Sequence, residues 1–276
     1  MDAGVLTWAV LLAGCTATLE ARAFDSVPSP HSAEVALLWQ PAPGAGRRPV
    51  VLALHGCGGL RGSRGALDAR YVDYAARWNA AGWHVLLADS FSARGVRSIC
   101  REPGPERSVT LAMRRKDVNA ALAWLQSRND VDPDRIALVG WSNGGSTVLR
   151  TIDRPQWTLA PAAAIAFYPG CAAALKNDRY APAVPLLVLI GALDDWTPAR
   201  PCEDLERRLN ARTAGPRVEL VTYADSYHGF DGTGAVRRLN DIPRGAEGYG
   251  VHVGGNPAAR ADALARTDRF LKKYLD

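Results

Sequence analysis

The chain has 276 residues, of which 47% are hydrophobic and 22% are charged, enough for one sizeable core and without a signature of disorder. Its formal net charge is +5, and its basic residues form only short clusters such as Arg114-Arg115-Lys116. A solvated helix face explains such clusters better than nucleic-acid binding does, so we expect no nucleic-acid partner.

The first 23 residues resemble an export signal. Gly4 to Cys15 is an apolar stretch too short for a permanent membrane anchor, and Ala21-Arg22-Ala23 fits a small-x-small cleavage site. Leu12 to Cys15 also resembles a bacterial lipobox, and lipidation of Cys15 would then attach the protein to a membrane. We expect cleavage after Ala23 and a periplasmic or secreted protein. A cytosolic protein with an apolar N-terminal arm is the third interpretation, since this stretch is preceded by Asp2 and no basic residue.

Strand and helix patterns alternate along the rest of the chain. Apolar runs predict strands at 34–40, 50–54, 83–88, 135–139, 162–168, 185–190 and 218–223. Helical spacing or composition predicts helices near 67–78, 109–125, 203–214 and 258–275, and one more directly after 140–144. This alternation is typical of a single α/β domain over 24–276, with a mostly parallel central sheet and helices on both faces. We expect the glycine-rich segment 229–257 to shape a pocket entrance.

The pentapeptide Gly140-Trp141-Ser142-Asn143-Gly144 follows the strand at 135–139 and precedes a predicted helix. A strand, a sharp turn, a serine and a helix in this order are the context of the G-x-S-x-G nucleophile elbow. The glycines allow the strand and the helix to approach closely, and the serine takes up a strained backbone conformation. An ordinary glycine-rich turn is the alternative interpretation.

Two further polar residues follow later strands. Asp194 lies just after the strand at 185–190, and His228 lies in the loop after the strand at 218–223. The order serine, acid, histidine is that of an α/β-hydrolase, and carboxyl ends of parallel strands gather at one edge of a sheet. We expect Ser142 as nucleophile, His228 as base and Asp194 as the residue that orients it. Asp195 is the competing acid.

These motifs resemble the dienelactone hydrolase family of the α/β-hydrolase fold. The resemblance rests on the elbow, on Gly191-x-x-Asp194-x-x-x-Pro198 and on Tyr227-His228-Gly229-Phe230-Asp231, and it extends from about Ala33 to the C-terminus. His55 to Gly59 and Asp89-Ser90-Phe91 are similar to secreted relatives of that family. The type enzymes use a cysteine nucleophile where this chain has Ser142, and their substrate-binding glutamate has no clear counterpart beside His55. The resemblance therefore implies the fold more firmly than a dienelactone substrate.

The oxyanion of an acyl-transfer reaction needs preorganised donors, and the backbone N–H groups of Asn143 and Cys57 are the predicted pair. His55 is expected to hold its loop by hydrogen bonding, although it is also a competitor for the role of base.

Four cysteines remain after Cys15, an even number that suggests two disulfides in an oxidising compartment. Three pairings are possible. We favour Cys57–Cys100 and Cys171–Cys202, because each pair would then join loops at the same edge of the sheet. No C-x-x-C or H-x-x-x-H spacing indicates a metal site.

Substrate identity is less determined. Arg94 is a candidate for binding an anionic group, with a loop salt bridge as the alternative. Trp141, Trp196 and Tyr227 are candidates for lining an acyl pocket, or for core packing, and Asn143 is a further candidate for substrate contact. The expected activity is hydrolysis of carboxylic esters or lactones through an acyl-enzyme, without a cofactor, because no nucleotide-binding motif is present. The alternatives are a peptidase or polyester depolymerase, and a non-catalytic binding protein of the same fold.

Overall fold

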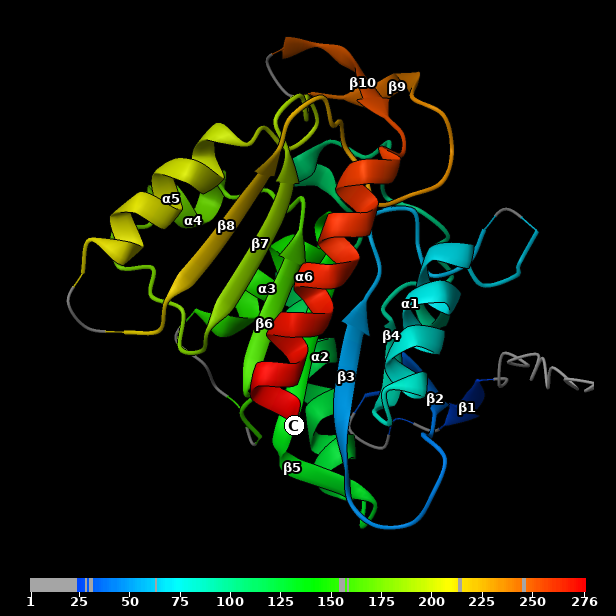
Figure 1. Cartoon of the computed structure of the whole chain (residues 1–276). Coiled ribbons are helices and arrows are strands. Elements are labelled where there is room, and N and C mark those ends of the chain that lie inside the picture. The colour runs from blue at the N-terminus through cyan, green and yellow to red at the C-terminus, as the bar shows by residue number, and fades with distance from the viewer. Residues whose placement is uncertain are drawn as a thin grey trace, which may run out of the picture.

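Strands with apolar residues on both faces form the centre of the protein. A computed structural model describes residues 24–276 except 28, 30, 31, 63, 154–156, 158, 213, 214, 245 and 246. The predicted export signal, residues 1–23, lies outside the described residues. An eight-stranded sheet has the order β1-β2-β4-β3-β5-β6-β7-β8 (Figure 1). Its strands are β1 (Asp25–Val27), β2 (Ala36–Gln40), β3 (Arg48–Leu54), β4 (His84–Asp89), β5 (Val131–Trp141), β6 (Ala163–Phe167), β7 (Leu186–Gly191) and β8 (Val218–Tyr223).

The sheet is parallel from β4 to β8, and β2 pairs antiparallel with both β1 and β4. Every residue of β4, β6 and β7 is buried, as expected for strands covered on both faces. The predicted α/β architecture with a mostly parallel sheet is confirmed.

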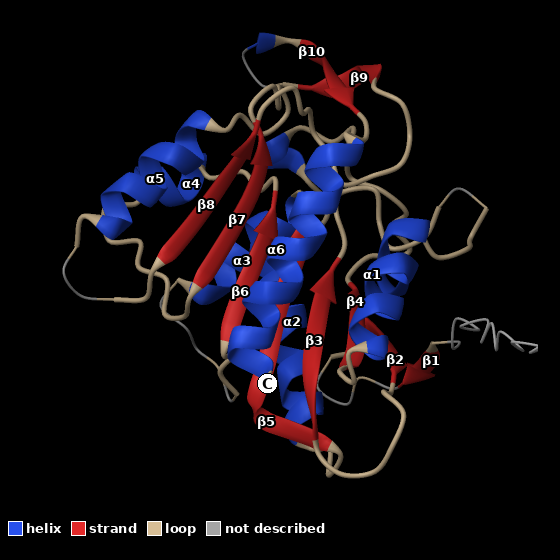
Figure 2. Cartoon of the chain, in the orientation of Figure 1, coloured by secondary structure: helices blue, strands red, loops and turns tan. Residues whose placement is uncertain are grey.

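Six helices cover the sheet within the described part of the chain: α1 (Ala69–Ala80), α2 (Leu111–Gln126), α3 (Asn143–Ile152), α4 (Ala172–Lys176), α5 (Arg200–Asn210) and α6 (Pro257–Leu275). α1 and α6 lie on one face, and α2 and α3 lie on the other (Figures 1 and 2). Side-chain caps begin three of them: Asp68 for α1, Thr110 for α2 and Asn256 for α6 each accept hydrogen bonds from first-turn amides. No helix in this described part is both long enough and apolar enough to cross a membrane.

Most predicted elements are present with ends shifted by a few residues, but β5 is longer than expected. It begins at Val131, four residues before the predicted strand at 135–139. Its pairing with β3 is irregular between Arg48 and Val50. Pro133 lacks an N–H group for a regular ladder, and such an irregularity accommodates it.

A separate two-stranded sheet was not predicted. β9 (Arg237–Pro243) and β10 (Tyr249–Val253) form an antiparallel hairpin beyond the carboxyl edge of the main sheet (Figure 1). The sequence of β9 is mostly charged and polar, with Leu239 and Ile242 as its aliphatic residues, so it lacks the alternation that identifies a strand. The expectation that 229–257 shapes a pocket entrance is confirmed, because this segment lines the main cavity.

The register places the carboxyl ends of the parallel strands at one edge. Leu54 pairs with Gly140, Phe167 with Leu189, and Gly191 with Tyr223. The loops after β3, β5, β7 and β8 therefore meet there, and they carry most of the polar residues singled out in the sequence.

We expect Gly144→Ala to destabilise the fold by about 1–3 kcal/mol or more, because overpacking forces backbone shifts. A β-carbon at Gly144 would lie 2.2 Å from the Leu54 carbonyl oxygen, which belongs to backbone. Urea unfolding of the variant and the wild type measures the difference.

Gly104→Ala is the matched control, since a β-carbon there meets nothing within 4 Å. Equal unfolding free energies for the two variants would contradict the tight contact at the elbow.

Candidate active site

Ser142 occupies a strained turn between β5 and α3, with φ 53° and ψ −115°. Its N–H donates to the Phe167 carbonyl at 2.8 Å, and its carbonyl accepts from Ser146 N–H at 2.8 Å. A β-carbon at Gly140 would lie 2.4 Å from the Gly144 backbone, so the strand and the helix approach as the sequence predicted. The positive φ and both glycine contacts are those of a nucleophile elbow.

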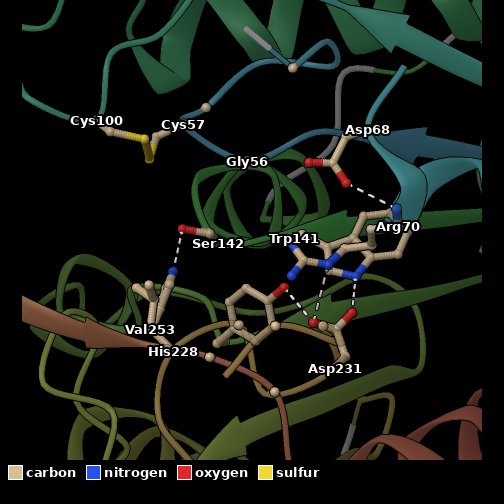
Figure 3. Close-up of a pocket in the computed structure, with 18 of the residues that line it drawn as sticks. Gly56, Cys57, Asp68, Arg70, Cys100, Trp141, Ser142, His228, Asp231 and Val253 are labelled. Atoms are coloured by element: carbon tan, nitrogen blue, oxygen red, sulfur yellow. Dashed lines mark hydrogen bonds and ion pairs between the residues drawn. A yellow bond between two sulfur atoms is a disulfide. The ribbon is translucent and has the colours of Figure 1, made fainter. Parts of the chain in front are cut away.

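The structure brings Ser142, His228 and Asp194 together in one hydrogen-bonded chain. Ser142 Oγ lies 2.9 Å from His228 Nε2 (Figure 3). His228 Nδ1 lies 2.8 Å from Asp194 Oδ2. His228 and Asp194 are buried, with 4% and 3% exposure. A neutral imidazole that donates from Nδ1 to the carboxylate presents an acceptor nitrogen to the serine hydroxyl.

Further donors hold the Asp194 carboxylate in place. Its Oδ1 accepts from the N–H groups of Trp196 at 3.0 Å and Thr197 at 2.8 Å, and its Oδ2 accepts from Thr197 Oγ1 at 3.0 Å. Thr197 Oγ1 is also 3.1 Å from His228 Nδ1. The sequence analysis did not identify Thr197, although it lies within the Gly191 to Pro198 motif.

Asp195, the competing acid, faces another histidine. Its Oδ1 accepts from His252 N–H at 2.8 Å, and its Oδ2 lies 2.8 Å from His252 Nδ1. Partial burial opposes ionisation, but the hydrogen bonds from His252 outweigh it and lower the pKa of Asp195. Asp195 therefore ties the loop after β7 to the hairpin strand β10.

The two predicted oxyanion donors come from two segments: Asn143 from the elbow, and Cys57 from the loop after β3. The Asn143 N–H is the first of α3, where a helix leaves amides without internal partners. Within the described residues, no backbone hydrogen bond occupies the Cys57 N–H, while the Cys57 carbonyl accepts from Ile99 N–H at 2.9 Å. A disulfide joins Cys57 to Cys100 beside Ser142 (Figure 3), and a second joins Cys171 to Cys202, so both favoured pairings are confirmed.

Arg114 connects the elbow to the loop after β3. The prediction that it lies on a solvated helix face is therefore wrong. It is fully buried, and its guanidinium donates to Asn143 Oδ1 at 2.6 Å and to the His55 carbonyl at 2.7 Å. Burial lowers its pKa to about 10, so it remains a cation at neutral pH. Because Arg114 binds the Asn143 side chain, the amide points away from the cavity. The expectation that this side chain contacts substrate is wrong.

His55 holds the loop after β3, as predicted. Its Nε2 accepts from Ser90 N–H at 3.1 Å, and its Nδ1 therefore carries the proton that it donates to the Gly56 carbonyl at 2.8 Å. Burial, together with the Arg114 charge, lowers the pKa of His55 to about 3. It bonds to its own loop and not to Ser142.

A cavity of about 760 Å³ opens above Ser142 and His228, between the loop after β3, α1 and the hairpin. Trp196 lines it and lies against the His228 ring, with centroids 4.7 Å apart. Trp141 borders it, but its indole is 1% exposed and stacks on Phe167. Tyr227 packs on His252 outside the cavity lining.

Arg94 is not at the site, which corrects its candidacy for substrate binding. Both of its terminal nitrogens donate to Asp117 at 2.8 Å, and one of them also donates to the Ser90 carbonyl. A second carboxylate, Glu34, lies 3.1 Å from it. Both terminal nitrogens of the guanidinium are thus bound by protein acceptors, and the loop salt bridge is the correct interpretation.

Asp231 also lies at the site, although it was not among the predicted site residues. The buried carboxylate of Asp231 accepts from Trp141 Nε1 at 2.9 Å and from the Tyr168 hydroxyl at 2.8 Å, and Arg70 Nε lies 3.3 Å from it (Figure 3). The motif that ends in Asp231 was recognised, but its partners lie on distant elements. The described residues contain no group of three or more His, Cys, Asp or Glu side chains able to hold a metal ion.

Comparisons with known proteins identify the fold and the family. Esterase 2 of Thermogutta terrifontis, phosphoramylated by tabun, superposes with a TM-score of 0.66 at 20% identity, covering 92% of this chain and 96% of that one. A putative dienelactone hydrolase from Klebsiella pneumoniae gives a TM-score of 0.66 at 18% identity, covering 91% and 98%. An uncharacterized protein of Mycobacterium tuberculosis is 31% identical over 199 residues, which span 66% of this chain and 63% of that protein.

The fold is therefore that of the α/β-hydrolases, with the site at the edge where that fold carries it. Residues 35–275 match the model of the dienelactone hydrolase family, and the chain belongs to that family.

We expect the unfolding free energy to fall as the pH falls from about 6.5 toward about 3, in part because of His55. Its folded pKa lies below the unfolded value, so the unfolded chain binds more protons in this window and is favoured by acid. The contribution is up to about 1.4 kcal/mol per pH unit. Denaturant unfolding across this range, for the wild type and for His55→Gln, measures the two slopes.

Glutamine keeps one donor and one acceptor but does not titrate. The same pH slope in both proteins would show that His55 is protonated in the fold as easily as in the unfolded chain.

Proposed function

We propose that the protein hydrolyses esters or lactones through a serine acyl-enzyme. Ser142 attacks the carbonyl carbon, and His228 Nε2 takes its proton as the carbon–oxygen bond forms. His228 then donates that proton to the leaving alkoxide, which departs as an alcohol and leaves an acylated Ser142. Water then attacks the acyl carbon while His228 takes its proton; the bond from the acyl carbon to Ser142 Oγ breaks, His228 returns the proton to Oγ, and the carboxylic acid is released. The hydrogen-bonded chain from Ser142 through His228 to Asp194 is the observation that carries this proposal.

Asp194 holds the imidazole tautomer and stabilises the imidazolium that forms during each step. The N–H groups of Cys57 and Asn143 would receive the oxyanion of the tetrahedral intermediate, where loss of one donor typically costs on the order of 3 kcal/mol in the barrier. Arg114 supports this pair because it binds both the Asn143 side chain and the His55 carbonyl.

The substrate is a small ester or lactone. The esterase from Thermogutta terrifontis has been crystallised with propionate and with butyrate, which favours short acyl chains here as well. The cavity of about 760 Å³ has room for more than such a chain, so a peptidase or polyester depolymerase is the second candidate. A non-catalytic binding protein is the third, and the intact hydrogen-bonded set at Ser142 disfavours it.

We propose export of the protein and a single domain over residues 24–276. Two disulfides favour an oxidising compartment, periplasmic or extracellular. We further propose cleavage after Ala23, with lipidation at Cys15 as the alternative.

The export proposal predicts a mature N-terminus at Phe24 when the full-length gene product is expressed in a bacterial host. Intact mass of the protein recovered from the periplasmic and membrane fractions measures it. A diacylglyceryl group on Cys15 in the membrane fraction would establish the alternative, and an unprocessed cytosolic chain would refute both.

We expect a fluorophosphonate probe to form one adduct at Ser142, visible by intact mass, and Ser142→Ala to lose both the adduct and ester turnover. A panel of p-nitrophenyl esters, lactones, aminoacyl amides and polyhydroxyalkanoate distinguishes the substrate classes. Asp194→Asn should lower kcat by on the order of 10⁴-fold, because the imidazole loses its tautomer and its counterion.

Asp195→Asn is the matched control, since this neighbour bonds to His252 instead. A larger loss of kcat in Asp195→Asn than in Asp194→Asn would reverse the assignment. A folded wild type that forms no adduct and hydrolyses no ester would remove the proposed mechanism.

A further inference from the structure

Asp231 is a buried carboxylate to which the mechanism above gives no role. It is 1% exposed and lies three residues after His228. Its two oxygens receive hydrogen bonds from different elements: Oδ2 from Trp141 of β5, and Oδ1 from Tyr168, which follows β6. Arg70 of α1 supplies a cation 3.3 Å from Oδ1 (Figure 3). The charge is thus matched, and both hydrogen-bonding partners are neutral donors.

One hydrogen-bonding partner, Tyr168, has a strained backbone, and the other, Trp141, directly precedes a residue that does. Among the described residues, three non-glycine residues have positive φ, and two of them are Ser142 at 53° and Tyr168 at 37°. Asp231 binds the side chain of Tyr168 itself and the side chain of Trp141, which directly precedes Ser142. Left-handed conformations of such residues persist where surrounding contacts over-determine them.

Tyr168 continues this connection to the base. Its ring lies 4.6 Å from the His228 ring, and its carbonyl accepts from Thr197 Oγ1 at 3.0 Å. Thr197 in turn bonds to Asp194. Burial raises the pKa of Tyr168 well above its usual value, so its hydroxyl stays protonated and donates to Asp231.

We propose that Asp231 is a positioning residue that sets the placement of Ser142 relative to His228. It holds the nucleophile side through Trp141 and the base side through Tyr168, from the same loop that carries His228. The inference rests on the proposed roles of Ser142 and His228. Because the partners are neutral donors, Asp231 acts through the positions of its oxygens more than through its charge.

If the positions of the oxygens matter more than the charge, substitutions should differ in how much kcat they lose. In Asp231→Asn the amide oxygen can accept from Trp141, while the amide N–H can donate to the Tyr168 oxygen, so both links survive although Arg70 loses its carboxylate partner. Asp231→Leu removes both links at similar volume. Tyr168→Phe removes one link and keeps the ring against His228.

The test measures kcat and KM of each variant on a p-nitrophenyl ester, and the rate of fluorophosphonate labelling at Ser142. We expect Asp231→Leu to lower kcat on the order of 100-fold with little change in KM, as a misplaced catalytic pair does. Tyr168→Phe should lose roughly tenfold, a fraction of that misplacement, and Asp231→Asn should lose least.

Tyr180→Phe is the matched control for Tyr168→Phe. The Tyr180 hydroxyl is also buried and makes one hydrogen bond, to the Leu149 carbonyl at 3.0 Å, away from the cavity. We expect a similar loss of stability in both, with kcat unchanged in Tyr180→Phe.

Wild-type kcat in folded Asp231→Leu and Tyr168→Phe would overturn the inference, and so would equal losses of kcat in Tyr168→Phe and Tyr180→Phe. If Asp231→Leu does not fold, the comparison of kcat between Tyr168→Phe and Tyr180→Phe tests the inference. Absence of labelling and turnover in the wild type would instead refute the proposed function. Labelling of the wild type and the folded Asp231 and Tyr168 variants at one rate would refute the positioning role alone.

Discussion

The backbone contact between the start of α3 and the end of β3 constrains everything else at the site. Gly144 packs on the carbonyl oxygens of Leu54 and His55, where a β-carbon would lie 2.2 and 2.6 Å from them. This approach places the first amide of α3 beside the loop that carries the Cys57 amide. The strained φ of Ser142 follows, because the chain must turn from strand to helix within one residue.

Buried polar groups stabilise this arrangement from three sides. Arg114 joins the elbow to the loop after β3, His55 holds that loop to Ser90, and Asp231 joins the elbow to the histidine loop. Each group is out of contact with water, so removing one partner leaves an unsatisfied donor or acceptor that costs about 1–3 kcal/mol. A site supported in this way is held rigidly before substrate arrives, which is what preorganised oxyanion donors require.

The two disulfides connect segments near the loops that carry the candidate site residues. Cys57 is tied to Cys100 in the loop after β4, and the pair borders the cavity. Cys171 and Cys202 join the segment after β6 to α5, which begins shortly after the Asp194 loop. A serine at the proposed nucleophile position also suits an oxidising compartment, where a free active-site thiol would be exposed to oxidation.

Local sequence patterns predicted most strands and helices of the main domain. They also predicted which loops carry the candidate site residues. Continuous apolar runs identified the parallel strands, and the spacing around Ser142, Asp194 and His228 identified the loops that meet at the carboxyl edge. Such features are local, because periodicity and glycine placement are read within a few residues. The order of the strands in the sheet was not predicted, because it depends on pairing between distant segments.

The partners of individual side chains became known only from the tertiary structure. They depend on which residues, far apart in the sequence, come into contact. Asp194 and Asp195 are adjacent in sequence, and their different partners, His228 and His252, separate their roles. Arg94 and Arg114 were indistinguishable as cations, yet one is bound by Asp117 and the other lies buried under the elbow. The partners of Asp231 carry no local signal, although its motif does, since a buried hydrogen bond is defined by its distant partner.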